Sequence, residues 1–321
     1  MDVDVSPREN FMLAARHEMP YWLPCPIFDG SLTVIQHGLK ERVDYGKDDW
    51  GVQWERKGMR ADSFPVNHPL SSPDMVEDYP LPSLNKSRII ECAKKAASTV
   101  DRNRVVLFGD NGWGLFERTW LLISMPRFFV WSFRHPDALK RLIERIAEIK
   151  ITITEWLITE VGIDIIAYGD DWGMEDRPLL SLEKWRTFIK PWLTKLYKVA
   201  KDYDVLVYQH SDGKVESLIP DLVEIGVDIL NIQRECNNWP RIIKEHGDRI
   251  TMWGGVSART LDIGNPEDIV KEVEECSQLG KNGGIILGPG HSLVYPEQKV
   301  EVMRKAWMTK GWYRIKPPQN P

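Results

Sequence analysis

The chain has 321 residues, of which 42% are hydrophobic and 28% are charged, a balance typical of folded globular proteins and too apolar for intrinsic disorder. The 42 Lys and Arg residues against 47 Asp and Glu residues give a net charge of −5, which argues against a nucleic-acid-binding protein, because such a protein needs a basic face. The length suits one large α/β domain or two smaller ones.

The N-terminal sequence and the cysteines indicate the cellular compartment to expect for the protein. The polar start, MDVDVSPREN, predicts no signal peptide, and the sequence contains no apolar run long enough to span a membrane. We therefore expect a cytoplasmic protein. The four cysteines are far apart and form no Cys-x-x-Cys pair, which excludes a disulfide scaffold and an all-cysteine zinc site of the usual spacing. The 14 tryptophans hint at an aromatic site, although core packing explains most of them more simply.

The first predicted element is a helix that begins after Ser6. Ser6 suits the N-cap, Pro7 the first helical position and Glu9 the third, which together make a capping box. The run YWLPCPIF at 21–28 predicts a strand with a proline-broken end. Residues 31–100 show little regular periodicity, and we expect this segment to be a lid or a site-shaping insertion.

From residue 105 the chain alternates between short β-branched runs and amphipathic helices, which is typical of a parallel sheet. The predicted strands are 105–110, 163–171, 205–212, 229–235, 250–257 and 284–292. The predicted helices include 135–161, 181–202, 215–225, 239–246, 267–279 and 296–309. With the run at 21–28 and room for one more strand, we predict a single eight-stranded (β/α) barrel, TIM-like, over residues 1–321. The Gly-x-Gly-x-x-Gly motif of dinucleotide folds does not follow the first strand.

Polar residues gather where the predicted strands end, and strand ends carry the active sites of (β/α) barrels. The clearest group is His210-Ser-Asp212-Gly. Residues two apart in a strand point to the same side, so His210 and Asp212 can meet one ligand. His291 follows another strand end after a Gly-rich turn. These three residues suit a zinc ion, or a hydrogen-bonded network in which Asp212 orients His210, and their spacing leaves both possibilities open.

Asp170 and Asp171 end another predicted strand. Adjacent strand residues face opposite ways, so we expect at most one of them to face the site, as a general acid or base or as a further metal ligand; the simpler alternative is a turn cap. The candidate catalytic residues are thus Asp170, Asp171 and His210. Glu117 and Arg118 are expected to form a structural ion pair. The candidate substrate contacts are Asn111, Trp113, Trp172, Gln233 and Trp253.

Several motifs, taken in order, resemble the uroporphyrinogen decarboxylase superfamily. They are DWGVQWE at 49–55, YGDDWG at 168–173, HSDG at 210–213 with IGVDILNIQ at 225–233, MWGG at 252–255 and GGIILGPGH at 283–291. The resemblance covers nearly the whole chain and implies a distorted (β/α) barrel. Members that decarboxylate porphyrinogens carry an Arg-rich N-terminal motif for a polycarboxylate, whereas the run at 21–28 has no arginine, so this substrate is not expected.

The sequence is more similar to the corrinoid-dependent methyltransferases of the superfamily. Their zinc is held by a His-x-Cys pair and a later Cys, and the corresponding residues here are His210, Asp212 and His291. Without thiolates the zinc would be harder and better matched to oxygen. The resemblance therefore implies a methyltransferase that takes the methyl group of a methoxylated aromatic and passes it to the Co(I) corrinoid of a partner protein. Zinc, or a protonated Asp170 or Asp171, would meet the leaving oxygen.

Three other functions are considered. The first is transfer of the methyl group from the methylated corrinoid protein to tetrahydrofolate or a thiol, although the missing cysteines weigh against a thiol. The second is a metal-free, uroporphyrinogen-decarboxylase-like decarboxylase acting on a smaller acid. The third is a non-catalytic binding protein, which the polar strand ends disfavour because burying polar groups without a task is costly.

Overall fold

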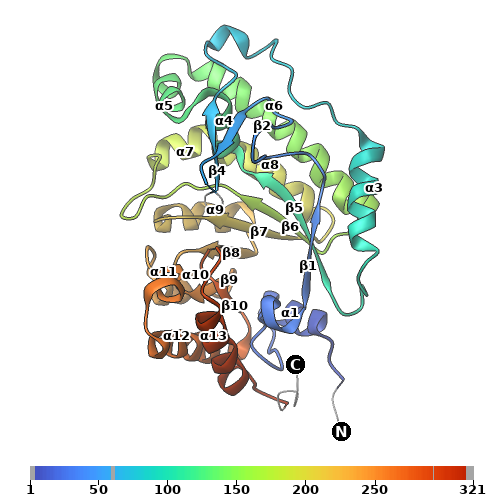
Figure 1. The fold of residues 1–321 in the computed structure, drawn as a ribbon, viewed down its shortest axis with the longest axis vertical. Helices are drawn as coiled ribbons and strands as arrows, with labels where there is room; N and C mark the ends of the chain where they lie inside the picture. Colours follow the sequence, from blue (N-terminus) through green and yellow to red (C-terminus); the bar gives the residue numbers. More distant parts are fainter. Residues whose placement is uncertain (1–3, 59–61, 292, 316–321) are drawn as a thin grey trace.

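The computed structural model describes residues 4–58, 62–291 and 293–315, and its centre is a curled sheet of seven parallel strands (Figure 1). The strand order is β1-β5-β6-β7-β8-β9-β10, so each strand after β1 pairs with the preceding sheet strand in the chain. The strands are β1 (Leu32–Gln36), β5 (Val106–Trp113), β6 (Ile165–Gly169), β7 (Leu206–Ser211), β8 (Ile229–Ile232), β9 (Thr251–Val256) and β10 (Ile285–Pro289).

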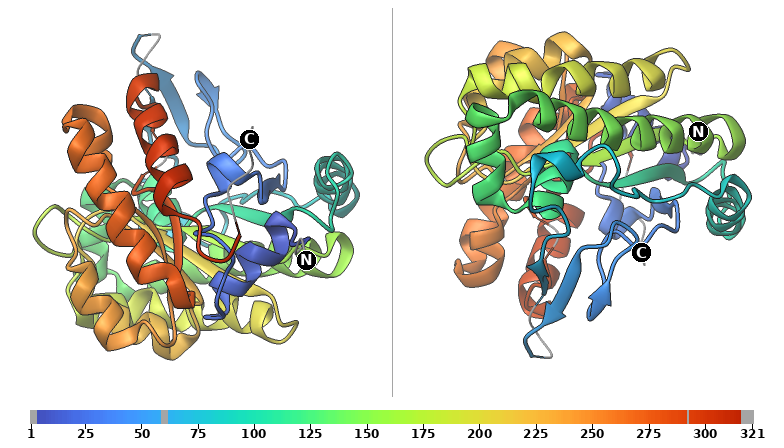
Figure 2. Two further views of the ribbon diagram at one scale, coloured as in Figure 1. Left: turned by 90° about the horizontal axis from the view of Figure 1, so that it is seen from below. Right: turned by 90° about the horizontal axis from the view of Figure 1, so that it is seen from above.

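Helices follow the strands and surround the sheet, which confirms the expected α/β alternation (Figures 1 and 2). They are α1 (Pro7–Ala15), α2 (Pro26–Asp29), α3 (Lys86–Ala97), α4 (Leu115–Ile123), α5 (Met125–Arg134), α6 (Pro136–Trp156), α7 (Leu182–Phe188), α8 (Lys190–Lys201), α9 (Ile219–Ile225), α10 (Trp239–His246), α11 (Ala258–Ile263), α12 (Pro266–Leu279) and α13 (Glu297–Lys310). Helix α6 packs on β5, α8 on β7, and α12 on β9 and β10. Among the described residues, none of these helices has the length and apolar character needed to cross a membrane.

Local sequence explains where the helices start and stop. The helix expected after Ser6 is present as α1, and the Ser6 hydroxyl accepts the N–H of Glu9 at 3.1 Å. The helix expected over 181–202 is interrupted, because α7 ends at Phe188 and α8 begins at Lys190. Pro191 lies in the first turn of α8, where its missing N–H costs nothing, but it could not continue a helix from α7.

The strand predicted at 21–28 is wrong. Residues Pro26–Asp29 form the short helix α2, and Trp22 contributes only an isolated bridge. The N–H of Leu287 in β10 does reach the Pro24 carbonyl, at 2.8 Å. The prolines within the run have no backbone N–H to donate to β10. A ladder of backbone hydrogen bonds therefore cannot continue beside this strand. The described sheet therefore has seven paired strands in place of the predicted eight.

The segment 31–100 is more regular than its sequence indicated. It begins with β1, the edge strand of the sheet, and later forms α3. Between them, β2 (Gly46–Lys47), β3 (Gln53–Arg56) and β4 (Ser63–Asn67) make a small antiparallel sheet, whose β3–β4 hairpin projects from the body in Figure 2. Its function as a lid or a site-shaping insertion, and the single-domain division over 1–321, stay predictions.

Inside the curl of the sheet, apolar side chains from the strands and from α1 fill the space in layers. Leu206 of β7 belongs to this inner cluster, and Tyr208 packs against it. Trp253 of β9 lies against Tyr208, with ring centroids 5.3 Å apart, and against Phe11 of α1, at 5.6 Å. Because side chains alternate along a strand, the next inward residue after Tyr208 is His210. The barrel interior is thus packed, and its polar layer begins at the carboxyl ends of the strands.

Candidate functional site

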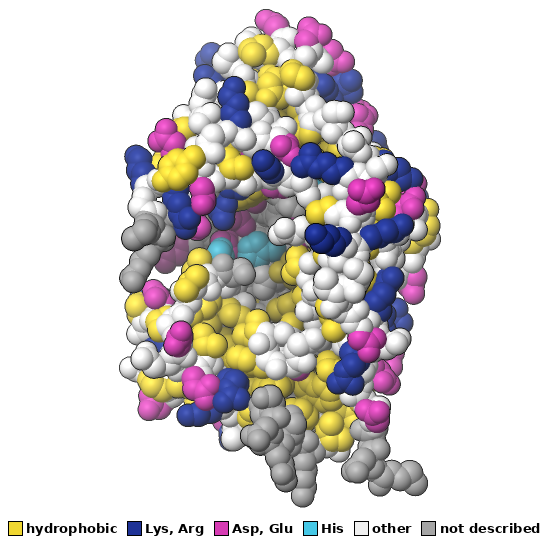
Figure 3. Space-filling model, turned by 45° about the vertical axis from the view of Figure 1, so that its right-hand side comes forward, with side chains coloured by type: hydrophobic (Ala, Val, Ile, Leu, Met, Phe, Trp, Pro, Cys, Tyr) yellow, Lys and Arg dark blue, Asp and Glu magenta, His cyan; other side chains and the backbone are white. Residues whose placement is uncertain are grey.

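A cleft of about 880 Å³ opens where β1, β5, β6 and β7 end. Histidine and acidic side chains are visible inside a hollow on the face drawn in Figure 3. Five carboxylates line the cleft, against the two cations Lys40 and Arg42. The carboxylates are those of Glu41, Asp62, Asp110, Glu117 and Asp171. The cleft is therefore polar and predominantly acidic.

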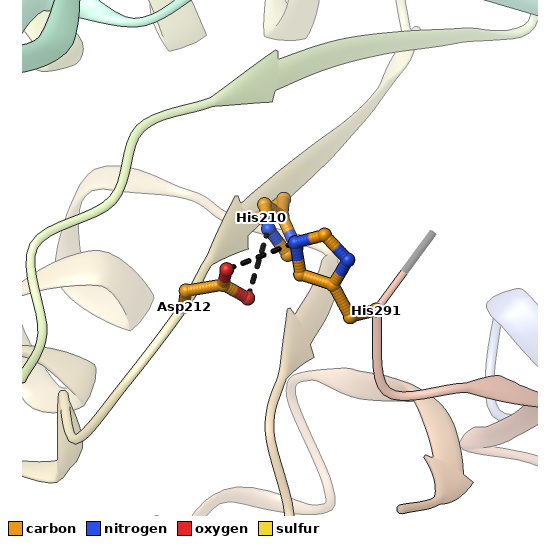
Figure 4. Close-up of side chains that lie close together, drawn as sticks. All are labelled: His210, Asp212 and His291. Atoms are coloured by element: carbon orange, nitrogen blue, oxygen red, sulfur yellow. Dashed lines mark ion pairs between the residues drawn. The ribbon is translucent and has the colours of Figure 1, made fainter. Parts of the chain in front are cut away.

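His210, Asp212 and His291 point toward one another beside this cleft (Figure 4). The Asp212 carboxylate spans the two imidazoles: Oδ2 lies 2.9 Å from Nε2 of His291, and Oδ1 lies 3.4 Å from Nε2 of His210. One ligand atom from each residue can be chosen so that all three lie within 4.8 Å of one another. The convergence expected from the spacing of His210 and Asp212 is thus present, and His291 joins them from three strands away.

The turn after β7 carries Asp212 and depends on two glycines. Gly213 has a φ of +73°, a left-handed conformation that favours glycine. A Cβ at Gly213 would lie 2.4 Å from the carbonyl carbon of Gly173, so the two backbones pass in direct contact. The Asp212 carbonyl accepts the N–H of Gly173 at 3.1 Å, and the Asp171 carboxylate accepts the N–H of Asp212 at 2.8 Å. The loop after β6 therefore fixes the position of Asp212.

His291 is held by the turn that follows β10. Gly290 donates its N–H to the carbonyl of Val256 in β9, at 2.8 Å. The hydroxyl of Tyr295 donates to the His291 carbonyl at 2.7 Å. Backbone contacts on both sides thus fix the direction from which His291 enters the site.

Asn231 of β8 orients His210, and the sequence did not single it out. The Asn231 side-chain amide donates from Nδ2 to the carbonyl of Trp253 at 2.7 Å, which turns its Oδ1 toward Nδ1 of His210 at 2.5 Å. Because an amide oxygen can only accept, Nδ1 of His210 carries the proton. The lone pair of Nε2 then faces Asp212 and the cleft, in the tautomer that a metal ligand requires.

We expect Asn231→Ala to weaken metal binding by about 10–100-fold, the usual effect of removing a group that orients a metal-bound histidine. The ring of His210 would lose the acceptor that selects its tautomer. Titration of the purified variant with Zn²⁺ against a competing chelator measures the effect, with the exposed Asn103→Ala as the matched control. Unchanged affinity in the Asn231 variant would exclude this orienting contribution.

The three residues strongly perturb one another's protonation. Burial raises the pKa of Asp212, but the imidazoles of His210 and His291 beside its carboxylate outweigh burial and hold the pKa well below its usual range. Burial lowers the pKa of His210, yet the nearby carboxylates of Asp212 and Asp171 leave it raised. For His291 the close contact with the Asp212 carboxylate is the largest influence and raises the pKa. Asp212 is therefore an anion throughout the neutral range.

The donor set fits a divalent metal ion. Two imidazole nitrogens and a carboxylate oxygen are a ligand set used by catalytic zinc, with a further position left for substrate. Oδ1 of Asp212 and Nδ1 of His291 are buried without a hydrogen-bond partner in the described structure. In a closed hydrogen-bonded network each such atom would normally be satisfied. The unpartnered Oδ1 of Asp212, which faces Nε2 of His210, favours the metal over the hydrogen-bonded network, the alternative that the sequence left open.

The two neighbouring aspartates separate as strand alternation requires. Asp171 lines the cleft, with Oδ1 at 3.5 Å from Nε2 of His210. Asp170 is fully buried on the opposite side, where its carboxylate accepts the N–H groups of Phe116 and Glu117 at the start of α4. Burial raises the pKa of Asp170 to about 7, although these two hydrogen bonds oppose the shift. Asp171 is thus the one placed to meet a ligand, and the catalytic function of either stays a prediction.

Of the five predicted substrate contacts, Trp113 lines the cleft and stacks on Trp54, with ring centroids 6.2 Å apart. The other four lie outside the lining that the described residues provide. Asn111 binds α6 through Thr154, Trp172 packs edge-on to Trp185, and Trp253 belongs to the inner cluster. Gln233 accepts the N–H of Gly213 at 2.9 Å and so supports the turn beneath Asp212. Their contact with substrate stays a prediction.

Two cleft carboxylates, those of Asp110 and Glu117, were not among the predicted site residues. Asp110 follows Val106 and Phe108 on the inward face of β5, so the alternation that selected His210 also selects Asp110 over Asn111. Glu117 was expected to pair with Arg118, and this prediction is wrong. Arg118 instead binds Glu41 at 2.5 Å and Asp48 at 3.1 Å, which leaves Glu117 facing the cleft. Nothing in the local sequence indicates these distant partners.

Comparison with known families and proteins agrees with the fold. A model of the family described as Uroporphyrinogen decarboxylase (URO-D) matches residues 59–309. Two curated relatives, both named methylcobamide:CoM methyltransferase MtaA and both from Methanosarcina barkeri, are 26% identical over 170 residues, which is 53% of this chain and 48% of theirs. The chain thus spans about half the length of the curated relatives it matches.

A solved structure gives the wider fold comparison. The methyltransferase from Methanosarcina mazei superposes with a TM-score of 0.69 at 19% identity, over 94% of this chain and 85% of that one. The two chains share a fold, and the expected TIM-like α/β barrel of uroporphyrinogen decarboxylase type is confirmed. The sequence resemblance to the methyltransferase branch of the superfamily is likewise confirmed by the curated relatives.

Proposed function

We propose that this chain, which belongs to the uroporphyrinogen decarboxylase (URO-D) family, is a corrinoid-dependent methyltransferase. The family model covers most of the chain, from residue 59 to residue 309. The relatives named as methylcobamide:CoM methyltransferases support a corrinoid as the second substrate, carried by a partner protein. The cleft at the carboxyl ends of the strands is where a barrel of this kind performs its chemistry.

The observation that carries the proposal is the meeting of His210, Asp212 and His291 beside the open cleft. We propose that these residues hold zinc. When bound, zinc would supply a Lewis acid for an oxygen atom of the substrate. With imidazole and carboxylate donors in place of thiolates, the ligand set suits oxygen better than sulfur.

The substrate that fits this preference best is a methyl ether, and we propose a methoxylated aromatic. Its methyl group would pass to the Co(I) corrinoid, and the aromatic oxygen would leave. Trp113 supplies a flat apolar wall, supported from behind by Trp54. The carboxyl groups of the cleft lie around the space that the leaving oxygen would occupy, and such groups can donate the proton that a phenolate needs.

A second candidate is transfer from the methylated corrinoid to a thiol, favoured by the name of the MtaA relatives. It would use the same cleft and metal site in a later methyl-transfer step. Decarboxylation of a porphyrinogen is disfavoured, because five carboxylates and only two cations line the cleft, and a polycarboxylate substrate would meet like charge.

The test is anaerobic mixing of the purified protein with cob(I)alamin and the methoxyarene guaiacol, with and without a chelator. Loss of the Co(I) absorbance with formation of methylcobalamin, abolished by the chelator, is expected. Methyl transfer that persists after verified removal of the metal would overturn the zinc proposal. If no methoxyarene reacts but a thiol demethylates methylcobalamin, the second candidate replaces the first.

A further inference from the structure

Glu117 is a buried acid that lines the cleft. The residue is 6% exposed, and it shares the cleft wall with Asp171, His210 and His291. No Lys, Arg or His pairs with it within residues 4–58, 62–291 and 293–315. A buried carboxylate without a cation is costly, so the structure must either compensate the charge of Glu117 or keep a proton on it.

Two groups close in sequence that could compensate the charge of Glu117 are already engaged. Glu117 lies in the first turn of α4, where backbone N–H groups normally stabilise an anion, but Asp170 accepts the N–H groups of Phe116 and Glu117 at 2.9 and 2.8 Å. Its chain neighbour Arg118 is occupied by Glu41 and Asp48. The carboxyl group of Glu117 therefore lies near two other acids, Asp170 and Asp171. Neither the N-terminus of α4 nor the guanidinium of Arg118 is free to offset its charge.

The remaining surroundings favour the protonated form. Burial raises the pKa of Glu117 well above its usual range, and the charges of Asp171 and Asp170 raise it further, whereas the N–H of Asp171 and the more distant Arg118 oppose the shift. Glu117 is not among the proposed metal ligands His210, Asp212 and His291. Glu117 is thus a buried acid with a raised pKa and no paired cation among the described residues, and it faces the substrate space.

We propose that Glu117 is the catalytic acid that protonates the leaving oxygen during methyl transfer. The inference rests on the proposed ether-cleaving function. In the step, the methyl–oxygen bond breaks as the electron pair of Co(I) forms the cobalt–methyl bond. The electron pair of the broken bond stays on oxygen, which takes the proton of Glu117. The products are the methylated Co(III) corrinoid, the phenol and the Glu117 carboxylate, which regains a proton from solvent.

A series of substituted anisoles with leaving phenols of different acidity tests the step, with cob(I)alamin as acceptor. Glu117→Gln keeps the side-chain size but has no acidic proton. We expect a loss of about 10²–10⁴-fold for the least acidic phenols and little loss for 4-nitroanisole, whose phenolate leaves unaided. The exposed Glu155→Gln on α6 is the matched control. An equal loss across the series, or no loss, would exclude Glu117 as the acid.

An infrared measurement tests the proton without any substrate. Recorded at pH 8, the carboxylic-acid C=O absorption should lose intensity in Glu117→Gln relative to wild type and keep its intensity in Glu155→Gln. Equal C=O intensity in wild type and Glu117→Gln would show that Glu117 does not carry the proton. If the band behaves as expected but wild type demethylates no anisole, the ether-cleaving function fails, and with it the proton transfer to an ether oxygen.

Discussion

Asp212→Ala is expected to abolish tight metal binding and, with it, methyl transfer. Asp212 is the central residue of the site, because its two carboxylate oxygens face Nε2 of His291 and Nε2 of His210. Its loss would leave two imidazoles of the assigned ligand set and remove the carboxylate that lies between them. Changing a residue that merely orients a ligand costs about 10–100-fold in affinity, so removal of the ligand itself should exceed about 100-fold.

The Asp212 prediction is checked by metal content after dialysis and by the initial rate of methylcobalamin formation. Asp78→Ala, an exposed aspartate far along the chain, serves as the control. Circular dichroism establishes that the variant is folded. A folded Asp212→Ala protein that retains stoichiometric zinc would contradict the assigned ligand set.

The strand-end chemistry could be predicted from the sequence because a strand has a period of two and a barrel has its active site at one end. His210 and Asp212 satisfy both rules, and His291 follows a second strand end. The assumption of a parallel barrel was therefore enough to predict that the three residues lie together. The same rule would have found Asp110, which lines the cleft two positions beyond Phe108. Its neighbour Asn111 was predicted as a substrate contact, but the Asn111 side chain binds Thr154 of α6.

The errors come from contacts between residues distant in sequence. The run at 21–28 has the residues of a strand, but a strand needs a partner with matching donors, and its prolines remove them. The strand β1, which lies within the segment 31–100, was not predicted. Its five residues are too few for the alternation of apolar and polar residues to be recognised beside a long loop. Asn231 and Glu117 owe their positions to Trp253 and Asp170, which no local pattern could reveal.

Arg118→Ala is expected to be strongly destabilising, with a loss of about 3–5 kcal/mol in the free energy of unfolding. The Arg118 side chain is fully buried and binds the carboxylates of Glu41 at 2.5 Å and Asp48 at 3.1 Å. Its guanidinium also lies 4.7 Å from the ring centre of Trp50. Removing it would leave two buried acids without their shared cation. Because Glu41 lines the cleft, the same change should also loosen the cleft wall.

The pH dependence of this loss distinguishes lost charge compensation from lost packing. Burial raises the pKa of Glu41, but Lys150, Arg118 and His37 lower it to about 2, below its ordinary value of 4.5. The depressed pKa stabilises the folded protein above about pH 4.5, and this stabilisation is lost as the pH falls toward 2. In Arg118→Ala the depression is smaller, so the difference in unfolding free energy between wild type and variant should be largest at pH 7 and shrink toward pH 3.

Urea denaturation of both proteins at pH 7 and pH 3 measures the two differences, with Arg141→Ala as the control. Arg141 also binds two carboxylates, those of Glu77 and Glu144, but on the surface, where water replaces the lost partner. Its removal should therefore leave the unfolding free energy close to that of wild type. An Arg118→Ala loss of equal size at both pH values would mean that the guanidinium stabilises the fold by packing on Trp50, and that the cleft wall does not depend on its charge.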